Sequence, residues 1–253
     1  MRNFKSILAL LVASMSLVAC GGSSNDSSTS ADPQLRAVHL SPDAPAVDIT
    51  VNGDVVLPGV VYRTASGLLS VDAGSTDISV LVPALDNASA LDATLNLVQD
   101  MKYTVIAANT VLNGLPLTAI VVMDDVEAPS AGMAAITAVH GSQAAQMAAP
   151  DGVDVYVTEP GADLPASPTL AGVIFGVISE ELEVPAGDYQ VRITPTGTTT
   201  VVYDSGTIPL ADGVEYIAIA ADDIDSESLV GLTILTDLES TPFLNVNNAP
   251  SVF

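Results

Sequence analysis

The sequence predicts an all-β fold of two tandem antiparallel β-sandwich (immunoglobulin-like) domains. Three observations predict it. Apolar and polar residues alternate with a period of two, as in Val47 to Val51, where Asp48 and Thr50 separate three apolar side chains. Turn residues interrupt this alternation at short intervals, which predicts about seven strands per unit and no convincing amphipathic helix. The chain also contains the same unit twice.

The amino terminus precedes these domains and has the features of a secretory signal. Two basic residues lie within the first five, and the apolar run from Ile7 to Val18 is too short to span a bilayer as a helix. The run ends at Leu17-Val18-Ala19-Cys20, which resembles the bacterial lipobox, and Cys20 is the only cysteine. We therefore expect residues 1–19 to be a lipoprotein signal peptide and Cys20 to be acylated. The alternatives are an ordinary secretory signal with a chance cysteine and an uncleaved anchor.

Residues 20–33 are predicted to be a lipidated, flexible tether, because they are rich in Gly, Ser and Asp and have no apolar period. An Asp directly after the cysteine tends to retain a lipoprotein in the inner membrane. Gly21 and Gly22 stand there instead, which implies the outer membrane, on its periplasmic or its exposed face. No later apolar run approaches the roughly 18 residues of a membrane-spanning helix.

The internal repeat sets the predicted domain boundaries. Arg36-Ala-Val-His39 and Thr137-Ala-Val-His140 open the two copies, so the two histidines of the chain occupy equivalent places. Asp48 and Asp154 match as well, although the second copy has five more residues between the histidine and the aspartate. The sequence predicts one repeat at 34–129, another at 130–240 and a C-terminal tail at 241–253. Each repeat has a normal domain size and is expected to fold alone.

Within the first repeat, Asn52-Gly53 predicts a hairpin because both residues accept a positive φ. A three-residue loop through Asp54 is slightly preferred, since it places Ile49 opposite Leu57. Tyr103 and Tyr216 are equivalent in the two repeats and lie in apolar strands, so we expect them in the cores with hydrogen-bonded hydroxyl groups.

The segment from Val38 to Asp48 reads VHLSPDAPAVD and resembles the opening motif of domain-of-unknown-function family 4397. The later Ala-Gly turns and the Tyr-Thr-Val strand fit as well, and the resemblance covers roughly residues 34–240. In the second copy, Gly141 to Ala148 replaces the Ser-Pro-Asp-Ala-Pro turn, so a function carried by that turn would be lost there. The resemblance implies a secreted β-domain and an extracytoplasmic setting, but no activity.

The composition excludes several classes of protein. The chain has 6 basic and 30 acidic residues, for a formal net charge of −24, so it lacks the basic surface of a nucleic-acid binder. One cysteine excludes a disulfide scaffold, and one cysteine with two histidines nearly excludes a tetrahedral zinc site. A hydrophobic content of 49% disfavours extended disorder.

Two groups of residues are candidate sites. His39 with Asp43 and Asp48 could act as a general base or a metal ligand, but no nucleophile motif accompanies them. The preferred interpretation is structural for His39, Asp48, His140 and Asp154. Asp222, Asp223, Asp225 and Glu227 could together bind calcium, although their spacing is not that of an EF-hand and a solvated loop is favoured.

These observations lead to the hypothesis of a non-catalytic lipoprotein with a binding or structural role at the cell envelope. It would require no cofactor, would contact the membrane through its lipid anchor, and would meet an unidentified envelope or extracellular ligand. A calcium-dependent adhesion or matrix-binding module is the alternative, and a hydrolase using His39 is a third hypothesis.

Overall fold

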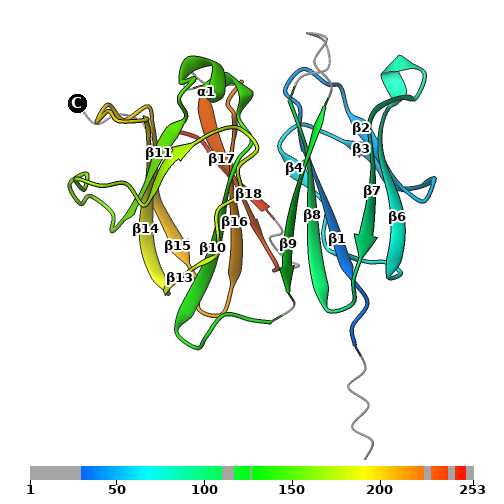
Figure 1. Cartoon of the computed structure of the whole chain (residues 1–253), viewed down its shortest axis with the longest axis horizontal. Coiled ribbons are helices and arrows are strands. Elements are labelled where there is room, and N and C mark those ends of the chain that lie inside the picture. Colours follow the sequence, from blue (N-terminus) through cyan, green and yellow to red (C-terminus); the bar gives the residue numbers. More distant parts are fainter. Residues whose placement is uncertain (1–29, 110–116, 126, 225–228, 239–242, 249–253) are drawn as a thin grey trace, which may run out of the picture. The chain divides into compact units, whose positions relative to one another are not determined.

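The computed structural model describes residues 30–109, 117–125, 127–224, 229–238 and 243–248. Residues 31–253 form one compact unit. It contains four β-sheets, two from each repeat, which stand one beside the next (Figure 1). The predicted all-β class with tandem sandwiches is therefore confirmed.

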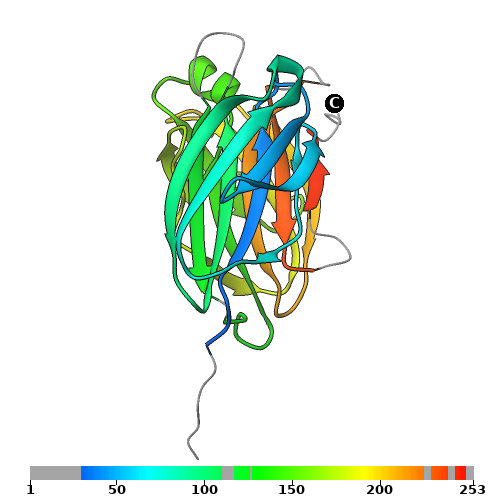
Figure 2. The same cartoon turned by 90° about the vertical axis from the view of Figure 1, so that its right-hand side faces the viewer.

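Repeat 1 supplies an inner sheet, which faces repeat 2, and an outer sheet. Inner sheet 1 has the order β4 (Thr64–Ala65), β1 (Gln34–Leu40), β8 (Met101–Ala108) and β9 (Thr118–Asp125), with β5 (Leu69–Ser70) also paired to β1. Outer sheet 1 has the order β3 (Asp54–Val60), β2 (Val47–Val51), β6 (Gly74–Val82) and β7 (Ala88–Leu97). A short 3₁₀ helix, Pro83–Leu85, joins β6 to β7. Figure 2 looks onto outer sheet 1.

Repeat 2 has the same arrangement. Inner sheet 2 has the order β13 (Leu182–Pro185), β10 (Met133–His140), β16 (Glu215–Asp222), β17 (Val230–Thr236) and β18 (Phe243–Val246). Outer sheet 2 has the order β12 (Leu170–Val173), β11 (Val153–Thr158), β14 (Gly187–Pro195) and β15 (Tyr203–Leu210). Strand β18 lies in the segment that the sequence predicted as a tail, and it extends the sheet by pairing with β17.

The inner sheets are mixed rather than purely antiparallel. The first strand of each repeat runs parallel to the first strand of a later hairpin. Strand β1 lies beside β8 of the β8–β9 hairpin, and β10 lies beside β16 of the β16–β17 hairpin. This pairing brings equivalent residues together in both repeats, His39 opposite Ala107 and His140 opposite Ala220. In each repeat, the surroundings of the histidine are therefore formed by two segments that lie far apart in the sequence.

The predicted hairpin forms with a two-residue turn instead of a three-residue loop. Val51 pairs with Asp54, and Asn52 and Gly53 between them have φ angles of 52° and 87°. A shift in register after Ile49 still places Ile49 opposite Leu57, as expected.

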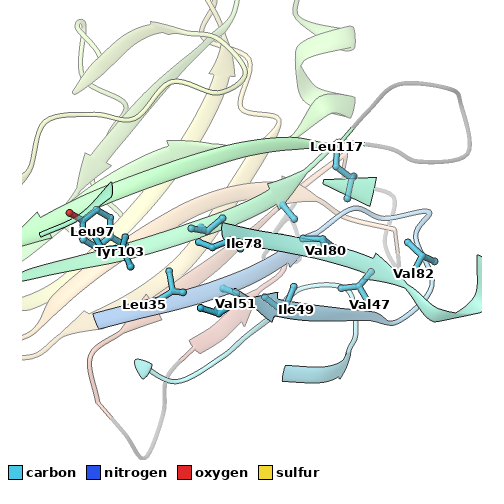
Figure 3. Close-up of a cluster of buried hydrophobic side chains, with 13 residues drawn as sticks. Leu35, Val47, Ile49, Val51, Ile78, Val80, Val82, Leu97, Tyr103 and Leu117 are labelled. Carbon is cyan, nitrogen blue, oxygen red and sulfur yellow. The ribbon is translucent and has the colours of Figure 1, made fainter. Parts of the chain in front are cut away.

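Each repeat has its own apolar core between its inner and outer sheets. In repeat 1, side chains from β1, β2, β6 and β8 point toward one another between the sheets (Figure 3). The two predicted core tyrosines are confirmed. The Tyr103 hydroxyl accepts a hydrogen bond from the Val98 N–H at 3.0 Å, and the Tyr216 hydroxyl accepts one from the Ala211 N–H at 2.9 Å. In both copies, the tyrosine hydroxyl therefore fixes the segment that lies just before its own strand.

A third core joins the repeats, because the two inner sheets pack face to face (Figure 1). This shared core contains Val38, Leu40, Ala65, Ile106, Ala108, Ile120 and Val122 from repeat 1 and Val139, Ile217, Ile219, Ala221 and Leu235 from repeat 2. Strands of the inner sheets are consequently buried on both faces. All seven residues of β17 are buried, whereas buried and accessible residues alternate along β6.

The segment of repeat 2 that contains the five-residue insertion forms the helix α1 (Gln143–Ala148), which the sequence did not predict. The Ser142 side chain caps it by accepting a hydrogen bond from the Ala145 N–H at 3.0 Å. The Asp222 carboxylate accepts from the Ser142 hydroxyl at 2.6 Å and from the Ala144 N–H at 3.0 Å. The insertion is thereby fixed to the end of β16.

The independent folding of each repeat stays a prediction, and the shared core adds a condition to it. A fragment ending at Ser130 should give a β-type circular dichroism spectrum, because its own core is complete, but it should self-associate through the exposed face of inner sheet 1. Sedimentation analysis should show this association, and Ile106→Lys within that face should abolish it. A monomeric unsubstituted fragment would contradict this expectation.

Candidate functional site

The two histidines have the same surroundings in both repeats. His39 and His140 are 0% and 2% exposed, and each lies near the end of the first strand of its repeat. The Nδ1 atom of His39 accepts a hydrogen bond from the Ser41 N–H, and that of His140 accepts one from the Ser142 N–H, each at 3.3 Å. Because Nδ1 is the acceptor, the proton of each neutral ring belongs on Nε2.

Burial keeps both imidazoles uncharged at neutral pH. It lowers the pKa of His39, and it lowers the pKa of His140 to about 4, with the residue's own backbone carbonyl opposing the shift. The Nε2 atoms of both rings are buried and have no hydrogen-bond partner among the described residues. Each histidine is therefore a neutral, buried ring rather than a general base exposed to substrate.

The repeat-equivalent aspartates bind the neighbouring strand of their outer sheet, β3 in repeat 1 and β12 in repeat 2. Asp48 accepts a hydrogen bond from the Gly59 N–H at 2.7 Å, and Asp154 accepts the matching one from the Gly172 N–H at 2.8 Å. Both glycines have positive φ angles, of 65° and 61°. In the third predicted member of the His39 group, Asp43, a carboxylate oxygen accepts a hydrogen bond from the Ser41 hydroxyl at 3.2 Å.

The candidate calcium ligands are only partly described. Asp222 holds the helix α1 through Ser142, and burial raises its pKa against the opposing effect of these hydrogen bonds. Asp223 is 7% exposed. Asp225 and Glu227 lie outside the described residues, as does Cys20. In the described part of the chain, no group of three or more His, Cys, Asp or Glu side chains is arranged to hold a metal ion.

Buried cations form a polar cluster between the repeats that the sequence analysis missed. The Lys102 ammonium of repeat 1 contacts the carboxylates of Glu215 and Asp237 in repeat 2, the latter at 2.8 Å. The Arg36 guanidinium donates to the Thr236 carbonyl at 2.9 Å and lies 3.8 Å from Asp237. These contacts connect the two inner sheets beside the shared apolar core.

Burial and the neighbouring Asp237 raise the pKa of Glu215 to about 8, although Lys102 opposes this shift. Burial lowers the pKa of Lys102, but Asp237 and Glu215 outweigh it and raise the pKa overall. The ammonium therefore stays charged, and two carboxylates compete for it within a small buried volume.

Arg63 makes a second polar connection between the repeats. Its guanidinium donates to the Leu232 carbonyl and to the Asn247 side chain, each at 2.7 Å. Gly231 of β17 makes this possible, because a Cβ atom there would lie 2.9 Å from two guanidinium nitrogens of Arg63. Arg192 is buried in outer sheet 2, so all four basic side chains of the described residues are buried. The charged groups that the described residues expose are therefore carboxylates.

A cavity of about 360 Å³ lies inside repeat 2, between inner sheet 2 and outer sheet 2. Its walls are mainly aliphatic and come from β10, β16 and β17 on one side and from β11, β12 and β14 on the other. His140 is part of the wall, and Glu180 and Glu181, both exposed, are also part of it. The volume falls within the range of small-molecule sites.

Small side chains open this space. Ala218 stands on the cavity wall where repeat 1 has the core residue Val105, and Val155 stands where repeat 1 has Ile49. Each substitution removes carbon atoms from the space between the sheets, and packed interiors do not close such gaps fully. The two copies thus share their histidine geometry but differ in how their cores are filled.

Comparison with known proteins supports the internal duplication. The sequence profile of a domain of unknown function, DUF4397, matches the chain twice, at residues 33–147 and 146–247. The chain belongs to the DUF4397 family. The suspected tandem copies of this domain are therefore confirmed, while no curated protein matches the sequence significantly. The first match contains both buried histidines, His39 and His140, and the second begins after them.

The pKa of His140 predicts an acid-sensitive contribution to stability. In the unfolded chain this histidine takes up a proton near pH 6.5, but in the folded protein only near pH 4. The unfolded state binds more protons between these values, so the free energy of unfolding should fall by roughly 3 kcal/mol as the pH drops from 6.5 to 4. Denaturant titrations of wild type and His140→Asn at pH 7 and pH 4 isolate this contribution, since other groups titrate in both proteins. If the free energy of unfolding fell equally in wild type and in His140→Asn, the prediction would be contradicted.

Proposed function

We propose that this protein is a non-catalytic lipoprotein of the cell envelope that binds a small apolar molecule inside repeat 2. The cavity of about 360 Å³ is the observation that carries the proposal. It combines a mainly aliphatic wall with a few polar side chains, among them His140, Thr169 and Ser179, which is the usual composition of a small-molecule site.

The chemistry of the described residues supports a binding role over a hydrolytic one. The Ser142 hydroxyl donates to Asp222, and it is the Ser142 backbone N–H, not the hydroxyl, that approaches His140. A serine nucleophile would instead donate its hydroxyl proton to the imidazole. Calcium-dependent adhesion has no comparable support, because Asp222 is already engaged at the start of α1.

Attachment through Cys20 places the protein at the outer membrane in this proposal, on the strength of the sequence pattern from Leu17 to Gly22. In the described residues, no helix combines the length and the apolarity needed to cross a bilayer.

The anchor is tested at the amino terminus. Mass spectrometry of the protein isolated from membranes should find a mature chain that begins at Cys20 and carries acyl groups. Cys20→Ser should release the protein from the membrane fraction, because several acyl chains hold it there. An unmodified terminus, or one that begins at another residue, would exclude lipid attachment at this site.

The binding site is tested by filling it. Isothermal titration calorimetry should detect binding of isopropylbenzene to the purified protein, and Ala218→Leu should weaken this binding at least about tenfold by occupying the space. Ala84→Leu, at an exposed position in repeat 1, is the matched control and should bind like wild type. Failure of wild type to bind, or equal binding by the Ala218→Leu variant, would overturn the proposed function.

A further inference from the structure

An acidic hollow adjoins the apolar cavity of repeat 2. The hollow has a volume of about 530 Å³ and lies between the repeats, where β9 ends and the connection to β10 begins. Glu181 lines both the hollow and the cavity, so the two spaces meet just before the start of β13. Six acidic side chains from both repeats line the hollow: Asp124, Asp125, Glu127, Glu181, Glu183 and Glu215.

Strand β13 forms part of the wall of each space and gives the two walls their different character. Successive residues of a strand point to opposite faces of the sheet. Leu182 accordingly lines the cavity and Val184 packs against the core of repeat 2, whereas Glu183 between them lines the hollow. A molecule that extends past Glu181 would therefore pass from an apolar to an acidic environment.

The cavity itself suits a hydrocarbon chain. Its wall is mainly aliphatic, and no Lys or Arg among the described residues lines it. Two polar side chains of the wall serve the backbone, since Thr169 accepts a hydrogen bond from the Val157 N–H at 3.0 Å and Ser179 accepts one from the Ala138 N–H at 2.8 Å. The charged end of a ligand would therefore lie outside the cavity.

The negative charge of the hollow is not balanced by its own lining. Among the described residues no basic side chain lines it, and the Lys102 ammonium, which contacts Glu215, is shared with a second carboxylate outside the hollow. Burial and then the charges of Asp124 and Asp125 raise the pKa of Glu181, as expected where carboxylates repel one another. A positive charge placed among them relieves this repulsion, whereas a carboxylate ligand increases it.

An organic cation fits the hollow better than a metal ion does. Calcium takes about six to eight oxygen ligands in direct contact. Within the described ranges, no three acidic side chains converge closely enough to hold an ion. An ammonium group needs no such convergence, because water can complete its hydration shell while the surrounding carboxylates attract it.

We propose that the cavity and the hollow form one site for a cationic amphiphile, whose alkyl chain lies between the sheets of repeat 2 and whose ammonium group lies in the hollow beside Glu181. The inference rests on the proposed function and adds a cationic end to its apolar ligand. At roughly 30 Å³ for each water-sized group, the cavity holds a chain of at most about twelve carbon atoms.

Probes with the same eight-carbon chain and different end groups test this preference by calorimetry on the purified protein, below their micellar concentrations. At low ionic strength, octylammonium should bind at least about fivefold more tightly than octan-1-ol, and octanoate should not bind measurably. The advantage of octylammonium should largely disappear in about 0.5 M sodium chloride, because salt screens the carboxylates. Ethylammonium, which lacks the chain, should not bind measurably.

Substitutions separate the charged end of the site from its apolar part. Glu181→Gln should weaken octylammonium binding about threefold and Glu181→Lys at least about tenfold, with no effect of either on octan-1-ol. Glu159→Gln, at an exposed position just after β11 that belongs to neither lining, is the matched control and should leave both affinities unchanged. Ala218→Leu, which fills the cavity, should weaken octylammonium and octan-1-ol alike.

The outcomes distinguish the ligand class from the binding function. Octan-1-ol binding as tightly as octylammonium, an equal effect of Glu181→Lys on both, or octylammonium binding that withstands Ala218→Leu would overturn the joint site. The proposed function would still stand if isopropylbenzene bound and lost affinity in the Ala218→Leu variant. If isopropylbenzene does not bind, the proposed function fails and the inference fails with it.

Discussion

The packing of the two inner sheets against each other is the constraint on which the rest of this structure depends. A sheet that lies between two layers has no solvated face, so its strands must be apolar on both sides. Strand β17 is buried along its whole length and β8 from Lys102 onward, although Lys102 and Thr104 of β8 and Thr233 and Thr236 of β17 are polar. Repeats 1 and 2 thus share a core in addition to their own.

Sheet packing of this kind also decides where the few positive charges lie. Charged groups beside an apolar interface need partners there, because an unpaired buried charge is costly. Arg36, Arg63 and Lys102 all extend from repeat 1 to backbone or side-chain oxygens of repeat 2. These three cations donate from repeat 1 to repeat 2, and the Asn245 side chain donates in the opposite direction, to the Arg63 carbonyl at 2.9 Å. The exterior is strongly acidic for the same reason, because the basic side chains of the described residues are buried.

Much of the fold could be predicted from the sequence, because its signals are local. The period of two, the duplicated segments and the positive φ of Asn52 and Gly53 each depend on a few neighbouring residues. The parallel pairing of β1 with β8 could not be predicted in this way, since it joins segments far apart in the chain. The helix α1 is too short to show a helical period.

The candidate site was harder to predict for the same reason. Sequence analysis identified His39 and His140 as equivalent, but the difference between the repeats lies at Ala218 and Val155, where the loss of a few carbon atoms leaves no motif. The sequence did contain a signal that indicated the shared core. The run Val105-Ile-Ala-Ala108 is continuously apolar, which is typical of a strand covered on both faces rather than on one.

The absence of a side chain at Gly231 affects which surface can pack against Arg63. Gly231 accommodates the Arg63 guanidinium, whereas the equivalent residue of repeat 1, next to Ala108 in the sheet, is Thr118. Thr118 has a Cβ atom where Gly231 has none, so the backbone of repeat 1 does not offer a guanidinium the room that β17 offers to Arg63. The two inner sheets, although they descend from one duplicated unit, are therefore not interchangeable as surfaces for this arginine.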